Sequence, residues 1–160
     1  MSRFLPDRNV LIGLRELRLV VPDARSKAIR RRIADKALLL RAAILDEAVH
    51  ALLPALWLYE VGNTVARPFP THASGWLSAL MKFGLEEALP SPTWLAKTLE
   101  LTSRYEVSFY DAAYHALALI QNGLFVTADT RYVSRVTESG SVIALSDWQP
   151  PRTPSSRRRS

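Results

Sequence analysis

The chain has 160 residues, of which 48% are hydrophobic and 22% charged, a composition typical of one soluble domain with a core. It contains no cysteine, which excludes a disulfide framework, a thiolate metal site and a cysteine nucleophile and suits a reducing cytoplasm. No apolar run approaches the roughly 20 residues that cross a bilayer, and no secretory signal pattern is present. We therefore expect a soluble cytoplasmic protein without membrane contact.

The net charge of +6 is concentrated at the two ends of the chain. Residues 1–32 carry nine Arg and Lys against three Asp and Glu, and the last ten residues carry four Arg. Residues 33–150 carry eight basic and twelve acidic residues, so the body of the chain is mildly acidic. Two interpretations stay open: the basic ends attract phosphate without sequence preference, or they form a solvated face and a disordered tail.

Strands and helices alternate in the first half of the chain. A short apolar run predicts a buried strand at 17–21, ended by Pro22, which lacks the amide hydrogen that a ladder needs. A helical pattern follows at 27–49, and its expected apolar face consists of Leu38, Ala42, Leu45 and Val49. The next predicted elements are a strand at 50–54, helices at 55–67 and 71–83, a strand at 85–89 and a helix at 92–105.

The alternation continues in the second half. Ser108 is the expected cap of a helix at 109–121, which is followed by a strand at 124–127, a helix at 130–138 and a strand at 141–145. Such a pattern predicts a parallel α/β sheet with helices on both faces. We expect an N-terminal extension at 1–16, one domain at 17–149 and a disordered basic tail at 150–160.

Four acidic residues stand where an α/β sheet binds ligands. In open parallel sheets, ligands bind beyond the carboxyl ends of the strands. Asp23 and Asp129 directly follow predicted strands, and Asp111 lies in the first turn of a predicted helix. Glu60 interrupts an otherwise apolar helix, in one polar stripe with Asn63, Thr64 and Arg67, and a carboxylate against a core is costly unless it is paired or binds a metal.

Each acid also has a structural explanation. Glu60 can pair with Arg67 or face water, and Asp111 fits a capping box with Ser108. Asp129 can be the N-cap of the helix that follows it, and Asp23 can be a turn residue or cap. His115 lies one turn after Asp111, and a histidine on an alanine-rich helix is more often packed than catalytic.

Taken together, the four acids predict a metal site. Carboxylates that converge at one end of a sheet repel one another unless a cation lies between them. Oxygen ligands of this kind suit Mg²⁺ or Mn²⁺. With a phosphodiester substrate, such an ion activates a bound water and stabilises charge on the leaving oxygen, so no nucleophilic side chain is required.

The acids lie in segments that resemble a known family. The segments are Val20-Val21-Pro22-Asp23-Ala24, Leu58-Tyr59-Glu60-Val61-Gly62-Asn63, Ser108-Phe109-Tyr110-Asp111-Ala112-Ala113-Tyr114 and Val126-Thr127-Ala128-Asp129. They resemble the four acidic motifs of PIN-domain nucleases, above all the VapC-type toxins of bacterial type II toxin–antitoxin pairs. The similar region spans residues 17–148.

The resemblance implies a three-layer α/β/α sandwich with a mainly parallel central sheet and Mg²⁺- or Mn²⁺-dependent endoribonuclease activity. It further implies RNA as the substrate, a homodimer, and a cognate antitoxin that blocks the site. Asp23, Glu60, Asp111 and Asp129 correspond to the catalytic metal ligands of the family. Asn63 and Thr127 fall where the family often has polar support for those acids.

The chain departs from the family pattern after Asp23. After this aspartate such toxins usually have a small residue, then serine or asparagine, then an apolar helix. Here Arg25 follows Ala24, Ser26 comes one place late, and five of the eight residues from Arg25 to Arg32 are basic. A second hypothesis is therefore a degenerate PIN-fold protein that binds an antitoxin or RNA without cleaving it. A third is a nucleic-acid-binding protein that uses its basic ends, although these lack interleaved aromatic residues.

Overall fold

A parallel sheet lies at the centre of the molecule. The computed structural model describes residues 9–12 and 27–151. Within these residues, five strands pair in the order β3-β2-β1-β4-β5, and every pairing is parallel. The strands are β1 (Asn9–Ile12), β2 (His50–Pro54), β3 (Glu86–Ala88), β4 (Leu124–Thr127) and β5 (Val142–Ala144).

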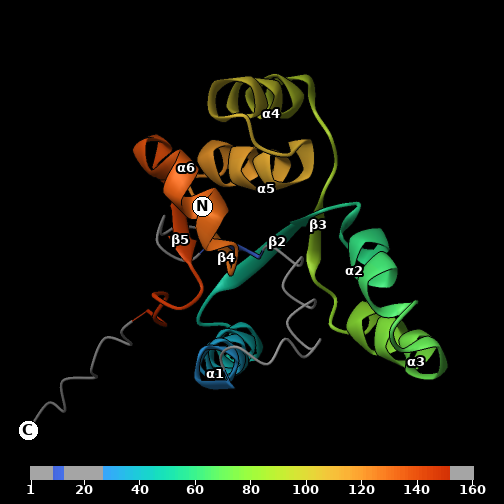
Figure 1. The fold of residues 1–160 in the computed structure, drawn as a ribbon. Helices are drawn as coiled ribbons and strands as arrows, with labels where there is room; N and C mark the ends of the chain where they lie inside the picture. Colours follow the sequence, from blue (N-terminus) through green and yellow to red (C-terminus); the bar gives the residue numbers. More distant parts are fainter. Residues whose placement is uncertain (1–8, 13–26, 152–160) are drawn as a thin grey trace, which may run out of the picture.

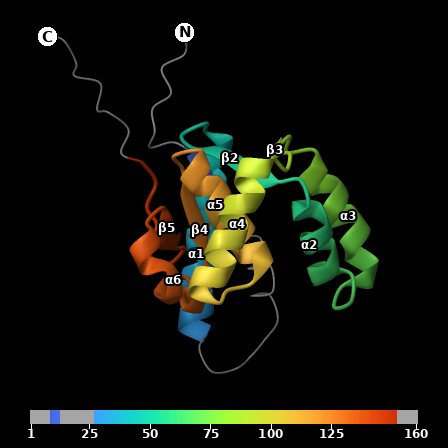
Figure 2. The same cartoon turned by 90° about the horizontal axis from the view of Figure 1, so that it is seen from above.

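Helices connect the strands and cover the sheet. They are α1 (Lys27–Leu45), α2 (Trp57–Val65), α3 (Pro70–Met81), α4 (Pro92–Tyr105), α5 (Phe109–Ile120), α6 (Thr130–Val136) and the 3₁₀ turn η3 (Thr137–Ser139). Figure 1 shows α1 on one side of the sheet and the α4–α5 pair on the other. Seen from above, α2 and α3 lie on the β3 side of the sheet and α6 lies beside β5 (Figure 2). The fold is therefore mixed α/β, as expected.

Two hydrophobic clusters lie on the two faces of the sheet. Successive side chains of a strand point to opposite faces, and the buried residues Phe125 and Val126 of β4 accordingly belong to different clusters. Phe125 packs with side chains of α4, α5 and α6, while Val126 packs with Leu40 and Ala43 of α1 and with Trp148. Nearly continuous apolar strands such as β2 and β4 are what a sheet covered on both faces requires.

The central strand differs from the one expected. Asn9–Ile12 pairs with β2 on one side and β4 on the other, so residues that we assigned to an N-terminal extension belong to the domain. The predicted strand at 17–21 lies outside the described residues. A strand of four residues carries little periodic signal, and Val10-Leu11-Ile12 is as apolar as the run that we chose.

The predicted apolar face of α1 is wrong. Leu38 and Leu45 are 61% and 54% exposed, whereas Leu40 and Ala43 are buried. Residues 38–40 are all leucine, and consecutive residues of a helix point in different directions. The sequence is therefore compatible with more than one apolar face for this helix. The face that packs on the sheet is the one that meets Val126, Leu145 and Trp148.

The helix also ends earlier than expected, at Leu45. Glu47 adopts a left-handed conformation with φ of 54°, and the Ala48 amide donates to the Ala43 carbonyl at 2.9 Å. This is the Schellman arrangement, which usually has glycine at the left-handed position. Because glutamate occupies this position here, the end of the helix could not be predicted from the residue type.

Most other elements agree with the sequence pattern. The ranges of β2, α4 and β4 are those predicted, and the ends of the remaining helices and strands differ by a few residues. Residues 152–160, where we expect a disordered tail, lie outside the described part. Among the described residues, no helix is long and apolar enough to cross a membrane.

Candidate acidic site around helix α5

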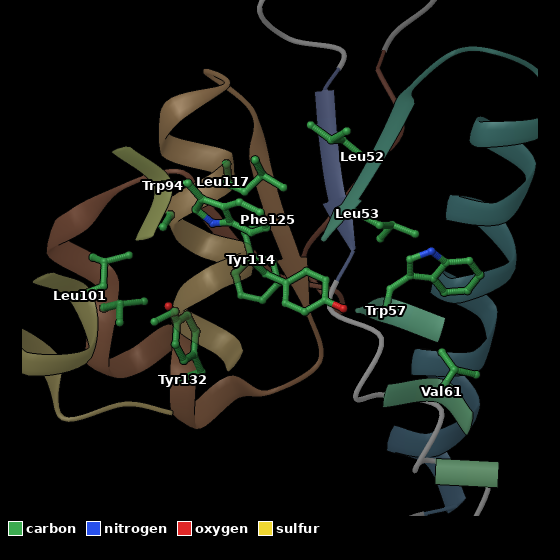
Figure 3. Packing of buried hydrophobic residues seen from close by; sticks show 14 of the residues in the cluster. Leu52, Leu53, Trp57, Val61, Trp94, Leu101, Tyr114, Leu117, Phe125 and Tyr132 are labelled. Atoms are coloured by element: carbon green, nitrogen blue, oxygen red, sulfur yellow. The ribbon is translucent and has the colours of Figure 1, made fainter. Parts of the chain in front are cut away.

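Glu60 reaches α5 through a tyrosine. The neighbouring α2 residues Trp57 and Val61 are buried in the core, which turns Glu60 to a partly buried position at the edge of that core. There the Tyr114 hydroxyl of α5 donates a hydrogen bond to Oε2 of Glu60 at 2.5 Å. Figure 3 shows Tyr114 extending from α5 toward the helix that carries Trp57 and Val61. Tyr114 is therefore a partner of Glu60 that neither of the two structural explanations, a pair with Arg67 or exposure to water, included.

Asp111 lies in the first turn of α5. Ser108 caps this helix: its Oγ accepts from the Asp111 amide at 3.1 Å and donates to Asp111 Oδ2 at 2.5 Å. The Ser108 half of the capping box expected from the sequence is therefore present, and the Asp111 carboxylate accepts from the Ser108 hydroxyl. An anionic side chain here also interacts favourably with the positive end of the helix dipole.

Asp129 follows β4 and begins α6. Its Oδ1 accepts from the amides of Arg131 and Tyr132, both at 3.0 Å, so Asp129 is the N-cap of α6. Its own amide donates to Oγ1 of the buried Thr127 at 3.1 Å. The Thr127 hydroxyl thus contacts the backbone of Asp129, and Asn63, the other residue expected to support the acids, is exposed on α2.

An aromatic cluster joins β4, α5 and α6. Phe125 of β4 stacks on Tyr114 with ring centroids 5.8 Å apart and meets Tyr132 of α6 edge-on at 5.6 Å. Burial, together with the negative charge of Asp111, raises the pKa of Tyr132 above that of an ordinary tyrosine.

His115 is completely buried beneath this site, so it is a packed residue, as expected. Its Nδ1 lies 2.9 Å from the Tyr132 hydroxyl and its Nε2 lies 2.7 Å from the Gly140 carbonyl. Burial lowers the pKa of His115, an effect to which Lys97 adds and which the Gly140 hydrogen bond partly offsets. The imidazole is therefore neutral near pH 7.

Of the residues that hydrogen-bond to the carboxylates of the acids, only Ser108 was predicted from the sequence, as a cap. Tyr114 and Tyr132 were not predicted. A usable signal existed for Tyr114, which is three residues after Asp111 and therefore on the same face of α5. Nothing in the sequence paired it with Glu60, because that contact depends on how α2 and α5 meet across the sheet.

The described acids do not form a finished metal site. Among residues 9–12 and 27–151, no group of three or more His, Asp or Glu side chains is arranged to hold an ion. Asp23, the fourth predicted ligand, lies outside the described residues. Glu60, Asp111 and Asp129 nevertheless offer carboxylate oxygens, the ligands that Mg²⁺ and Mn²⁺ prefer. One or two such carboxylates suffice for Mg²⁺ when substrate phosphate and water complete its shell.

Comparison with known proteins adds no assignment. No protein-family model matches the sequence, and no curated protein matches it.

Proposed function

We propose that the chain is a PIN-like, metal-dependent endoribonuclease with the three-layer α/β/α architecture of that family. The support is threefold: the four acidic segments, the parallel sheet with helices on both sides, and the hydrogen bond that joins Glu60 to the helix bearing Asp111. In this proposal Mg²⁺ or Mn²⁺ is the cofactor, RNA is the substrate, and water is the nucleophile.

The observation that carries the proposal is the hydrogen bond between Tyr114 and Glu60. It holds an acid of α2 against the helix that bears Asp111 one turn earlier. Asp129 begins α6, whose Tyr132 is affected by the charge of Asp111. Glu60 and Asp111, which are distant in sequence, are therefore both associated with α5, and Asp129 caps the helix whose Tyr132 contacts His115 of α5.

The chain's own groups have separate tasks in this proposal. Glu60, Asp111 and Asp129, with Asp23 as a fourth, would hold the ion. When bound, a divalent ion lowers the pKa of a coordinated water and stabilises charge on the leaving oxygen. The Ser108 hydroxyl, the Tyr114 hydroxyl and the α6 amides fix three of the carboxylates by hydrogen bonds, so that little reorganisation is needed when the charge develops.

The biological setting follows from the same resemblance. We propose a cytoplasmic toxin of a toxin–antitoxin pair that forms a homodimer and is inhibited by its cognate antitoxin. A short reading frame immediately upstream of the gene that encodes a DNA-binding antitoxin would support this setting, and its absence would count against it.

One observation favours a second candidate function. In each of the three described acids a carboxylate oxygen accepts a hydrogen bond within the protein: from Tyr114, from Ser108 and from the α6 amides. These bonds stabilise the fold without any metal. The alternative is therefore a PIN-fold protein that binds an antitoxin or RNA and does not cleave.

A fluorogenic RNA cleavage assay with Mg²⁺, Mn²⁺ or EDTA separates the two candidates. Asp111→Asn keeps the side-chain shape and an acceptor for Ser108 but removes the charge, so it should abolish metal-dependent cleavage. Glu100→Gln is the matched control, because Glu100 is an exposed acid of α4 that pairs with Lys97. Cleavage in neither metal, together with retained RNA or antitoxin binding, would establish the non-catalytic protein.

The tail is tested separately by removing residues 151–160. The truncated protein should still cleave RNA. If cleavage disappears with the tail while Asp111→Asn retains it, the active site has been assigned to the wrong part of the chain.

A further inference from the structure

The buried imidazole of His115 holds α6 at two points. One ring nitrogen faces the hydroxyl of Tyr132, which lies in the first turn of α6, and the other faces the carbonyl of Gly140, just after η3. With seven residues, α6 is too short to be stable on its own. Its position therefore depends on contacts with neighbouring elements, and this pair of hydrogen bonds holds it at both ends.

The direction of these hydrogen bonds follows from their partners. The Gly140 carbonyl can only accept, so Nε2 of His115 carries the proton. The Ser139 hydroxyl donates to the Val136 carbonyl at 2.5 Å, which leaves its oxygen able to accept from the same Nε2 at 3.3 Å. In a neutral imidazole, Nδ1 is then an acceptor, and the Tyr132 hydroxyl must be the donor.

This hydrogen-bonded link joins two of the acids. His115 lies four residues after Asp111, on the same face of α5. Tyr132 donates its amide to Asp129, so a shift of the tyrosine also shifts the cap. The chain of contacts therefore runs from the α5 face that bears Asp111, through His115 and Tyr132, to Asp129.

We propose that His115 is a positioning residue, which holds α6 and its acidic cap Asp129 against α5 by accepting a hydrogen bond from Tyr132. The expected effect on catalysis rests on the proposed function, whereas the claim that His115 holds α6 against α5 is independent of it. Neither side chain reaches substrate in this role; both act through Asp129.

Tyr132→Phe is the sharpest variant, because it removes one hydroxyl and keeps the ring that packs on Phe125. Thr98→Val is its matched control: Thr98 is fully buried in α4, and its hydroxyl donates to the Trp94 carbonyl at 2.8 Å. Each variant therefore loses one buried hydroxyl and one hydrogen bond, and only the first loosens α6.

The first readout is amide hydrogen exchange, which needs no activity. In Tyr132→Phe, exchange at residues 131–133 should accelerate about tenfold relative to the amides of β2 and β4, while Thr98→Val should leave this ratio unchanged. The proposal would be overturned if exchange in Tyr132→Phe accelerated equally at residues 131–133 and in β2 and β4, or if the two variants gave the same ratio. The His115–Tyr132 hydrogen bond would then contribute only to overall stability.

The second readout is the kinetics of metal-dependent RNA cleavage by the full chain. Loss of a residue that orients a metal ligand typically costs about 10- to 100-fold in activity, so kcat should fall by that factor in Tyr132→Phe while KM for RNA stays constant. His115→Gln, which retains a donor and an acceptor, should recover part of the rate lost in His115→Leu. An unchanged kcat in Tyr132→Phe, or no recovery, would refute the positioning role.

The two readouts separate the two proposals. If the wild-type chain cleaves no RNA in either metal, the proposed nuclease function fails, and the exchange ratio still decides whether His115 and Tyr132 hold α6. If the wild type cleaves and the exchange ratio does not change, the nuclease stands and the positioning role fails.

Discussion

The Tyr114 hydroxyl and the Glu60 carboxylate are joined by a 2.5 Å hydrogen bond between two helices that are distant in the sequence. Hydrogen bonds to charged groups contribute about 1.5–3 kcal/mol. Tyr114→Phe keeps the stack on Phe125 and should lower the free energy of unfolding by about 1.5 kcal/mol, the lower end of this range, because Glu60 is partly exposed. Urea denaturation measures the change.

Tyr59→Phe is the control for that experiment, because the Tyr59 side chain is 76% exposed on the same helix as Glu60. Its stability should match that of the wild type within about 0.5 kcal/mol, as is usual for surface substitutions. Equal losses in the two variants would contradict a specific Tyr114–Glu60 contribution.

Substitutions at Asp129 should separate its capping role from its charge. Asn caps helices as well as Asp, whereas Ala at an N-cap costs about 0.5–2 kcal/mol. We therefore expect Asp129→Asn to keep the wild-type melting temperature and Asp129→Ala to lower it. Under the proposed function both variants lose metal-dependent cleavage, so a stable Asp129→Asn protein that still cleaves would remove Asp129 from the metal site.

His115 should make stability depend on pH. Because its pKa in the folded protein is below the ordinary value of 6.5, the unfolded chain binds the extra proton first as the pH falls. The unfolded state then holds more protons, so stability decreases with falling pH. This contribution is fully present above about pH 6.5 and is lost as the pH drops from there toward the folded-state pKa.

Urea denaturation at a series of pH values tests this dependence. His115→Gln cannot titrate, and the slope of stability against pH below 6.5 should therefore be smaller in this variant than in the wild type. His50 and His72 are exposed and present in both proteins, so they do not affect the comparison. Identical slopes would show that His115 does not change protonation on unfolding.

Two glycines should respond to alanine in opposite directions. Gly140 has φ of 71° and ψ of −174°, a region that is essentially restricted to glycine, where other residues pay about 1–3 kcal/mol. A Cβ added at Gly140, or at Gly75 in an exposed position of α3, meets no other atom within 4 Å. Gly140→Ala should therefore destabilise through backbone strain alone, and Gly75→Ala should stabilise by about 0.5–1 kcal/mol. Thermal unfolding of both variants checks the two signs.

The sequence predicted elements well where one local pattern dominated. The Ser91-Pro92 start of α4 and the Ser108 cap of α5 fix the beginnings of two helices, and both are observed. It failed for the apolar face of α1, where two local patterns were equally good, and it missed Asn9–Ile12, a strand too short to carry a periodic signal. In both cases the packing of distant elements decides, and that information is not local.

The candidate site was predictable only in part. The cap roles of Asp111 and Asp129 follow from the residues beside them. The Glu60–Tyr114 bond and the His115–Tyr132 link could not be predicted, because each joins two helices whose relative placement depends on the whole sheet.

The position of β1 has a consequence for synthesis on the ribosome. Asn9–Ile12 pairs with β2 and β4, and β4 is made only after α1 through α5 have been synthesised. Until then only β1, β2 and β3 are available to pair, and the edge of β1 that later binds β4 is open to other chains. Such long-range pairing also slows folding, so newly made molecules should be most prone to aggregate, and most dependent on chaperones, just before Leu124–Thr127 emerges.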